Sequence, residues 1–216
     1  MSPWREVNRL VYFGRVHRSV YFPQPSAYSG GVTTTTKAKP RERLLAAAEQ
    51  LFYREGVHIG VDRLCEVAQV SKRSMYQHFG SKDEVLVAML EHRAPQVMAG
   101  LDTASDAPPR DRILAVFDSL TAQAESPDFL GCPFVSVATE LKDREHPASV
   151  AARAYKLELT AFFEQQARRA GATDPASLGV QLTMMFDGAG AYSVVRGGAS
   201  PAMRSAVEAL LAAQGM

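Results

Sequence analysis

The chain has 216 residues, of which 46% are hydrophobic and 22% charged, and its formal net charge is +1. This composition excludes a disordered protein, and the length suits one large domain or two small ones. The apolar runs are shorter than the ~18 residues that a membrane-spanning helix needs, so we expect no membrane segment.

Charge is distributed unevenly along the chain. Residues 1–36 carry four arginines and one glutamate, residues 37–100 carry ten basic and eight acidic residues, and residues 101–216 carry ten basic and fourteen acidic residues. Contact with a polyanion is therefore expected in the first half. The two cysteines, Cys65 and Cys132, lie in apolar settings, are too few for a disulfide scaffold and suit a reducing cytoplasm.

Residues 1–36 show no sustained periodicity. The segment YFPQPSAYSGGVTTTT is rich in Pro, Gly, Ser and Thr, as flexible linkers are. The apolar piece LVYF before it is too short for a signal peptide and is soon followed by basic residues. We interpret residues 1–36 as a flexible extension of the kind that translation from an upstream start codon would add to a domain. The alternative is a basic arm that touches DNA.

A helical pattern begins at Pro40. Apolar residues recur there at three- and four-residue steps, and Gly56 suits the end of this helix. A short second helix is predicted from Val61, and Ser71 is a good N-cap for a third helix that ends near Gly80. The arrangement from about 61 to 79 is therefore helix, short turn, helix.

Six further helices are predicted after the third. SKDE, at residues 81–84, forms a capping box that starts a fourth helix, which Pro95 must kink or end. Proline and polar residues then precede apolar-periodic runs. These runs predict helices at roughly 109–125, 132–142, 147–170, 174–196 and 200–213. No stretch alternates convincingly with period two, so the predicted fold class is all-α, with an N-terminal three-helix unit and a C-terminal helical bundle.

The second and third helices have the spacing of a helix-turn-helix, whose second helix enters the major groove of DNA. Met75 and Phe79 lie four residues apart and are expected to pack on the first two helices. The remaining surface is polar and basic, and the N-terminus of a helix favours phosphate. The alternative is an ordinary exposed basic helix inside a bundle.

Base-reading and phosphate-binding residues can be separated by their chemistry. Arg73 is the best candidate to read guanine, because a guanidinium bonds O6 and N7 together, and Gln77 could read adenine in the same way. Tyr76 and Lys82 are expected to contact phosphate oxygens. The predicted DNA-binding residues are Lys72, Arg73, Ser74, Tyr76, Gln77, His78 and Lys82.

From about Lys37 to Leu90 the chain resembles the DNA-binding domain of TetR-type (tetracycline-repressor-like) transcriptional regulators. The resemblance is carried by LLAAAEQLFYREGVH and VDRLCEVAQVSKRSMYQHFGSKDEVL, with the specific core VSK..MY.HF.SK. It implies that residues 71–79 read an operator in double-stranded DNA. Two residues depart from the family pattern. Gly60 replaces a capping Thr or Ser, and Gln69 replaces a turn glycine, which costs roughly 1 kcal/mol if its φ is positive.

The resemblance also implies a division into domains. We expect a flexible extension over 1–36, a helix-turn-helix DNA-binding domain over 37–90, and a ligand-binding and dimerisation domain over 91–216. The helices near 147–170 and 174–196 are the expected homodimer interface. An effector would favour a state with wrongly spaced recognition helices, and the helix from Ser81 would transmit the shift.

Apolar side chains in the C-terminal half can line an effector pocket or fill a core. The predicted ligand-binding residues are Phe117, Phe134, Tyr155, Met184 and Asp187. Asp187 lies in an apolar helix and could anchor a ligand or cap a polar network. FDGAGAYSVVRGG, at residues 186–198, lacks the third glycine and the strand context of a dinucleotide site.

Catalysis has little support. Cys132 is followed by Pro133 and has no nearby histidine, and the five histidines lack metal-ligand spacing. We therefore expect no catalytic residue, no metal and no cofactor. A thiol at Cys132 could act as a redox sensor, although a buried structural thiol is the more common case.

The predicted function is a cytoplasmic dimeric repressor that binds a palindromic operator and is released by a small-molecule effector. One alternative is a helix-turn-helix DNA-binding protein without an effector. The other is a helical enzyme with a fortuitously basic helix.

Overall fold

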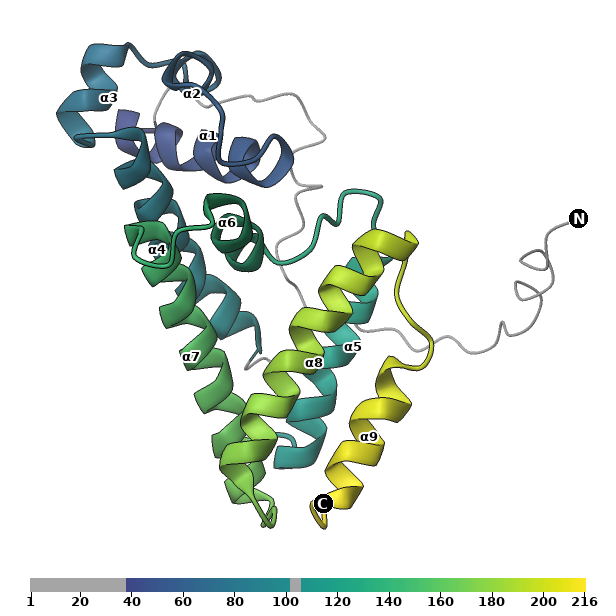
Figure 1. The fold of residues 1–216 in the computed structure, drawn as a ribbon. Coiled ribbons are helices and arrows are strands. Elements are labelled where there is room, and N and C mark those ends of the chain that lie inside the picture. The colour runs from purple at the N-terminus through teal and green to yellow at the C-terminus, as the bar shows by residue number, and fades with distance from the viewer. Residues whose placement is uncertain (1–37, 102–105) are drawn as a thin grey trace, which may run out of the picture.

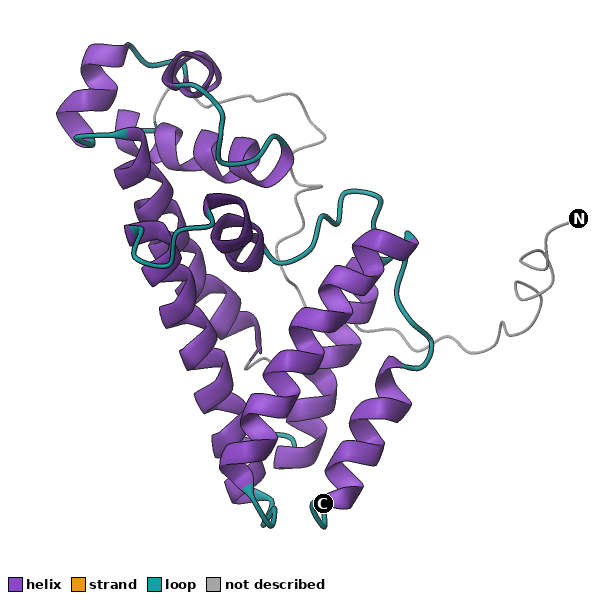
Figure 2. Ribbon diagram, viewed as in Figure 1, coloured by secondary structure: helices purple, strands orange, loops and turns teal. Residues whose placement is uncertain are grey.

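The structure, a computed structural model, describes residues 38–101 and 106–216 (Figure 1). The regular elements in these ranges are all α-helices, which confirms the predicted fold class (Figure 2). The predicted extension over 1–36 lies outside the described residues. None of the helices in the described ranges has the length and apolar character to cross a membrane. In chain order, the helices are α1 Pro40–Arg54, α2 Val61–Ala68, α3 Lys72–His78, α4 Lys82–Leu101, α5 Pro109–Ala124, α6 Pro133–Leu141, α7 Pro147–Arg169, α8 Pro175–Arg196 and α9 Met203–Ala213.

The helices form an elongated molecule with the N-terminal unit at one end (Figure 1). Helices α1, α2 and α3 pack together there, and α4 leads away from them alongside α7. Helices α5 and α8 pack against the other half of α7, and α9 packs on α5 and α8. The short helix α6 lies between these two regions and packs against both α1 and α7 (Figure 1).

Proline and capping residues define most helix starts. A proline occupies the first turn of α1, α5, α6, α7 and α8, where its missing N–H costs no helical hydrogen bond. The Ser71 and Asp174 side chains cap α3 and α8 by accepting backbone N–H bonds from Ser74 and Ser177. Pro95 lies inside α4, which continues to Leu101, so the fourth helix does not end at this proline.

Two buried apolar clusters hold the fold together. The first joins the apolar faces of α1 to α4 with α6 and the first half of α7. The second joins α5, α8 and α9 with the second half of α7. The first cluster therefore extends from the N-terminal unit past the predicted division at residue 90, and it ties the helix-turn-helix mechanically to α6 and α7.

Gln69 ends α2 in the left-handed conformation, with φ 53° and ψ 45°. A side chain with a Cβ is strained there, so we expect Gln69→Gly to stabilise the protein by about 1 kcal/mol. Urea denaturation would measure this change. Gln69→Ala is the matched control, because it removes the same polar atoms but keeps the Cβ and should give no gain. A Gly variant no more stable than the Ala variant would contradict the prediction.

Candidate functional site

The apolar face of α3 is buried and its polar face is exposed. Met75 is 0% exposed and Phe79 5% exposed, and α3 packs on α1 and α2. The Arg41 guanidinium lies over the Phe79 ring, 5.3 Å from its centroid. The expected packing of this helix is therefore confirmed, and the orientation of α3 is fixed by two buried anchors.

The predicted DNA-binding residues of α3 lie on the surface that this packing leaves free. Lys72, Arg73, Tyr76, Gln77 and His78 are exposed. Ser74 is half-buried, and its backbone N–H donates to the Ser71 hydroxyl that caps the helix. Because two anchors hold the helix, the exposed side chains project from a rigid element.

Both lysines among the predicted DNA-binding residues already bind other groups of the protein. The Lys72 ammonium lies 2.6 Å from an Asp62 carboxylate oxygen, and this hydrogen bond raises the pKa of Lys72. Lys82 donates to the carbonyls of Val57 and Ile59, at 2.7 and 3.1 Å. A lysine ammonium has three N–H donors, so two bonds to the backbone leave one for phosphate. Lys82 therefore fastens the α1–α2 connection as well as lying near the recognition helix.

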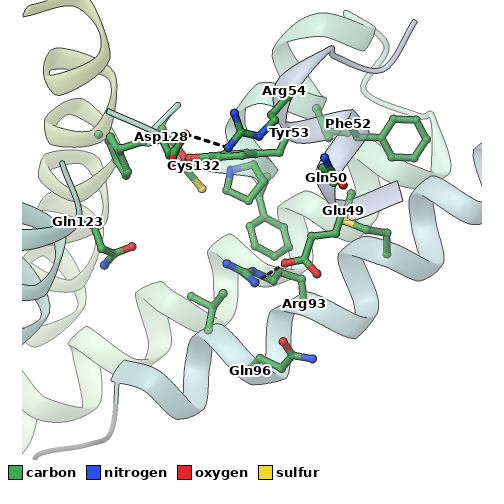
Figure 3. A pocket seen from close by; sticks show the side chains of 18 of the residues that line it. Glu49, Gln50, Phe52, Tyr53, Arg54, Arg93, Gln96, Gln123, Asp128 and Cys132 are labelled. Atoms are coloured by element: carbon green, nitrogen blue, oxygen red, sulfur yellow. Dashed lines mark hydrogen bonds and ion pairs between the residues drawn. The ribbon is translucent and has the colours of Figure 1, made fainter. Parts of the chain in front are cut away.

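A cavity of about 730 Å³ lies between the N-terminal unit and the C-terminal helices. Its walls come from α1, α4, α5, α6, α7 and α8, together with the loop that follows α5 (Figure 3). Phe134 and Tyr155 line it and stack on each other, with ring centroids 3.9 Å apart. Burial is the main cause that raises the pKa of Tyr155, so its hydroxyl stays neutral.

The structure does not bring the five predicted ligand residues together. Phe117 packs against Phe163 in the second core cluster, away from the cavity lining. Met184 is 68% exposed on α8. Asp187 forms an ion pair with Lys156, as expected of an acid that caps a polar network. Aromatic residues at helical spacing do not reveal which helix face meets a cavity and which meets a core.

Sequence reasoning missed the polar lining of the cavity. Glu49 pairs with Arg93, and Arg54 lies 2.8 Å from Asp128, so the charged lining residues form two neutral pairs (Figure 3). Three of these four residues come from α1 and α4, beside the predicted DNA-binding unit. A polar helix face ordinarily meets solvent, so the sequence offered no signal for this role.

The two cysteines lie in different surroundings. Cys132 is half-buried and lines the cavity, whereas Cys65 is buried in α2 and its pKa is raised by burial. Both thiols are free. Among the residues that the structure describes, no three His, Cys, Asp or Glu side chains gather as metal ligands would.

The Tyr53 hydroxyl fastens the cavity loop to α1. It accepts a hydrogen bond from the Leu130 N–H at 2.7 Å and donates to the Gly131 carbonyl at 3.1 Å. Burial raises the pKa of Tyr53. We expect Tyr53→Phe to destabilise the protein by about 1–2 kcal/mol, because it leaves the carbonyl of the buried Gly131 and the N–H of Leu130 without their partner.

Thermal and urea denaturation would measure the Tyr53→Phe effect. Tyr76→Phe is the matched control, because Tyr76 is 53% exposed and its hydroxyl should contribute little to stability. Equal stability of the two variants would contradict the structural role of Tyr53.

Comparison with known proteins places the chain in a family. Residues 44–89 match the model of bacterial regulatory proteins of the tetR family. The transcriptional repressor NemR of Escherichia coli K12 is 36% identical over 113 residues, which make up 50% of this chain and 57% of NemR. The transcriptional activator FasR of Mycolicibacterium smegmatis is 39% identical over 62 residues, 28% of each protein. The matched part thus spans little more than half of the first relative and about a quarter of the second.

Several solved structures have a fold similar to that of this protein over most of its chain. A putative TetR transcriptional regulator of Streptomyces avermitilis is 46% identical with a TM-score of 0.78, over 83% of this chain and 100% of that one. SCO4454, a TetR-family regulator of Streptomyces coelicolor, is 28% identical with a TM-score of 0.74, over 82% and 96%. The reduced form of E. coli NemR is 27% identical with a TM-score of 0.66, over 81% and 95%. The chain therefore belongs to the TetR family of bacterial regulatory proteins, which are transcriptional regulators and not enzymes.

Proposed function

We propose that this protein is a cytoplasmic dimeric repressor that binds a palindromic operator and is released by a small-molecule effector. The observation that carries the proposal is the rigid presentation of α3, whose basic and polar face is exposed while Met75 and Phe79 anchor it. Repression is favoured by the likeness to NemR, a repressor, although FasR is an activator. The division into a DNA-binding domain over 37–90 and a regulatory domain over 91–216 belongs to this proposal.

DNA recognition would use residues of α3 and the first residue of α4. Arg73 and Gln77 have the chemistry to read base edges, and Tyr76 and Lys82 have the chemistry to hold phosphates. Ser74 and His78 are weaker candidates for base contacts. Lys72 would exchange its bond to Asp62 for a bond to a phosphate. Both side chains are exposed, so breaking this ion pair costs little free energy.

Dimerisation is supported by an apolar stripe on two adjacent helices. Helices α7 and α8 pack together (Figure 1). Their outer faces expose small and apolar residues at helical spacing: Val150, Ala154, Leu157 and Ala161 on α7, and Val180, Met184, Gly188, Ala191 and Val195 on α8. A twofold axis would place this stripe against its own copy, and it would also give two recognition helices for two half-sites.

The effector would occupy the cavity between the N-terminal unit and the C-terminal helices. Its volume of about 730 Å³ lies within the range of small-molecule sites. Aromatic walls and charged groups that already pair with each other favour a neutral, largely aromatic molecule over an ion. Glutamines 50, 96 and 123 supply hydrogen bonds that could orient it.

Filling the cavity tests this assignment. Gly190 is buried and lines the cavity, and a Cβ built there meets nothing within 4 Å. We expect Gly190→Phe to abolish binding of the neutral fluorophore N-phenyl-1-naphthylamine, while Gly190→Ala, the matched control, retains it. Fluorescence titration measures both variants. Unchanged binding to the Phe variant would show that the probe, and by extension the effector, binds elsewhere.

A regulator without an effector remains the second candidate, because its DNA-binding face would be the same. Thermal shift against a library of neutral aromatic metabolites separates the two. Stabilisation by a compound that also lowers operator affinity supports the effector. Failure of every compound to stabilise the protein favours the second candidate.

A further inference from the structure

The connection between α1 and α2 is held by two side chains from distant parts of the chain. The Val57 N–H donates to a Glu140 carboxylate oxygen at 2.8 Å, and the Val57 carbonyl accepts from Lys82 at 2.7 Å. Glu140 lies on α6, whereas Lys82 opens α4 directly after the recognition helix. Through its N–H and its carbonyl, Val57 therefore connects α6 with the start of α4, which follows the helix-turn-helix.

The Glu140 carboxylate is closely fitted to this connection. Its second oxygen accepts from the Ser136 hydroxyl at 3.0 Å, so each oxygen has its own donor. A Cβ at Gly56, whose φ is +86°, would lie 2.6 Å from the oxygen that binds Val57. A glycine at this position thus lets the carboxylate reach the backbone, and a hydrogen bond to a carboxylate is stronger than one to a neutral acceptor.

The same short helix forms part of the cavity wall. Pro133, Phe134 and Val137 of α6 line the cavity, and Val137 lies three residues before Glu140. Helix α6 has only nine residues, so a displacement at its cavity side moves Glu140 as well. Helix α2 begins at Val61, four residues after Val57, and α2 packs on α3.

We propose that Glu140 is a positioning residue that transmits the state of the cavity to the recognition helix through Val57. This inference rests on the proposed effector function, and it names the contacts through which a change at the cavity would reach the recognition helix. An effector that fits one position of α6 better than another would shift the α1–α2 connection and, with it, the orientation of α2 and α3. This route runs across α6 and is distinct from a shift transmitted along α4.

Hydrogen exchange of the Val57 amide in the full-length protein tests the route without an effector. We expect Glu140→Ala to speed this exchange at least about tenfold, because the amide loses its acceptor. Glu140→Gln retains an acceptor oxygen, but a neutral one, so it should speed the exchange less than Glu140→Ala does. Ser136→Ala, which removes only the donor that orients Glu140, should give a smaller increase. Exchange in α8 serves as the folding reference for every variant.

A double-mutant cycle then tests transmission from the cavity. Val137→Ala loosens the cavity side of α6 and should speed Val57 exchange in the wild-type background but add nothing to Glu140→Ala. Val97→Ala is the matched control, because Val97 lines the same cavity from α4, and any effect it has should be equal in both backgrounds. A merely structural role for Glu140 would not make the Val137 effect depend on it.

The outcomes separate this inference from the proposed function. Unchanged Val57 exchange in Glu140→Ala, or a Val137 effect of equal size with and without Glu140, overturns the route even if the wild type binds DNA. Capture of genomic fragments by the wild type is measured in parallel. If no fragment is retained, the proposed function fails, while the exchange cycle still decides whether α6 and the α1–α2 connection are coupled.

Discussion

Arg73→Ala is expected to lower operator affinity by about 1–3 kcal/mol at each half-site, a loss of roughly 5- to 150-fold, and to relax the preference at one base pair. Arg73 lies on the exposed face of α3, one residue after its first position, and the buried anchors Met75 and Phe79 fix the direction in which that face points. A guanidinium held there can bond guanine O6 and N7 together, and alanine can bond neither.

Three further variants make the Arg73 result specific. Arg73→Lys keeps the charge but loses the planar fork, so it should retain binding to random DNA and still lose the base preference. Tyr76→Phe and Lys82→Ala should weaken all sequences alike, because their proposed partners are phosphates. Competition gel shifts with single-base operator variants measure these effects. An Arg73→Ala protein with unchanged operator affinity would show that another residue reads the base.

Leu157→Glu is expected to convert the proposed dimer to a monomer and to reduce affinity for a two-half-site operator by at least roughly 100-fold, because the second half-site contact is no longer tethered to the first. Leu157 is 65% exposed on α7, in the apolar stripe that α7 and α8 share. Around a twofold axis the substitution would bury two carboxylates in one apolar contact.

A matched substitution separates dimerisation from a general effect of added charge. Leu130 is 41% exposed in the loop before α6, outside the α7–α8 stripe, so Leu130→Glu should leave the dimer intact. Light scattering coupled to size exclusion gives the mass of each variant. A Leu157→Glu protein that remains dimeric would place the interface on another face.

Helix positions could be predicted because local punctuation determines them. The helices expected at 109–125 and 147–170 occur at Pro109–Ala124 and Pro147–Arg169, each begun by the proline that the sequence displays. The strained turn at Gln69 could also be predicted, because Gln69 occupies a position where the family resemblance leads us to expect glycine. Its φ is positive. Information of this kind lies within a few residues of the element it specifies.

The cavity could not be predicted, because it depends on contacts between distant residues. Tyr53 meets Leu130 and Gly131 across more than 70 positions, and Arg93 meets Glu49 across 44. Met184 was expected at a ligand but lies on an exposed face of α8. Periodicity reports that a helix has two faces; it does not report which neighbour covers each face.

The most direct test of the account is to sequence the genomic fragments that the full-length protein retains at physiological salt. If α3 is the reading helix of a twofold dimer, the retained fragments share an inverted repeat whose half-site centres are about one helical turn, roughly 34–36 Å, or a multiple of it apart. In that case Arg73→Ala broadens one position in each half-site. Fragments with no common inverted repeat, or no retention above random DNA, would contradict the claim that α3 recognises an operator.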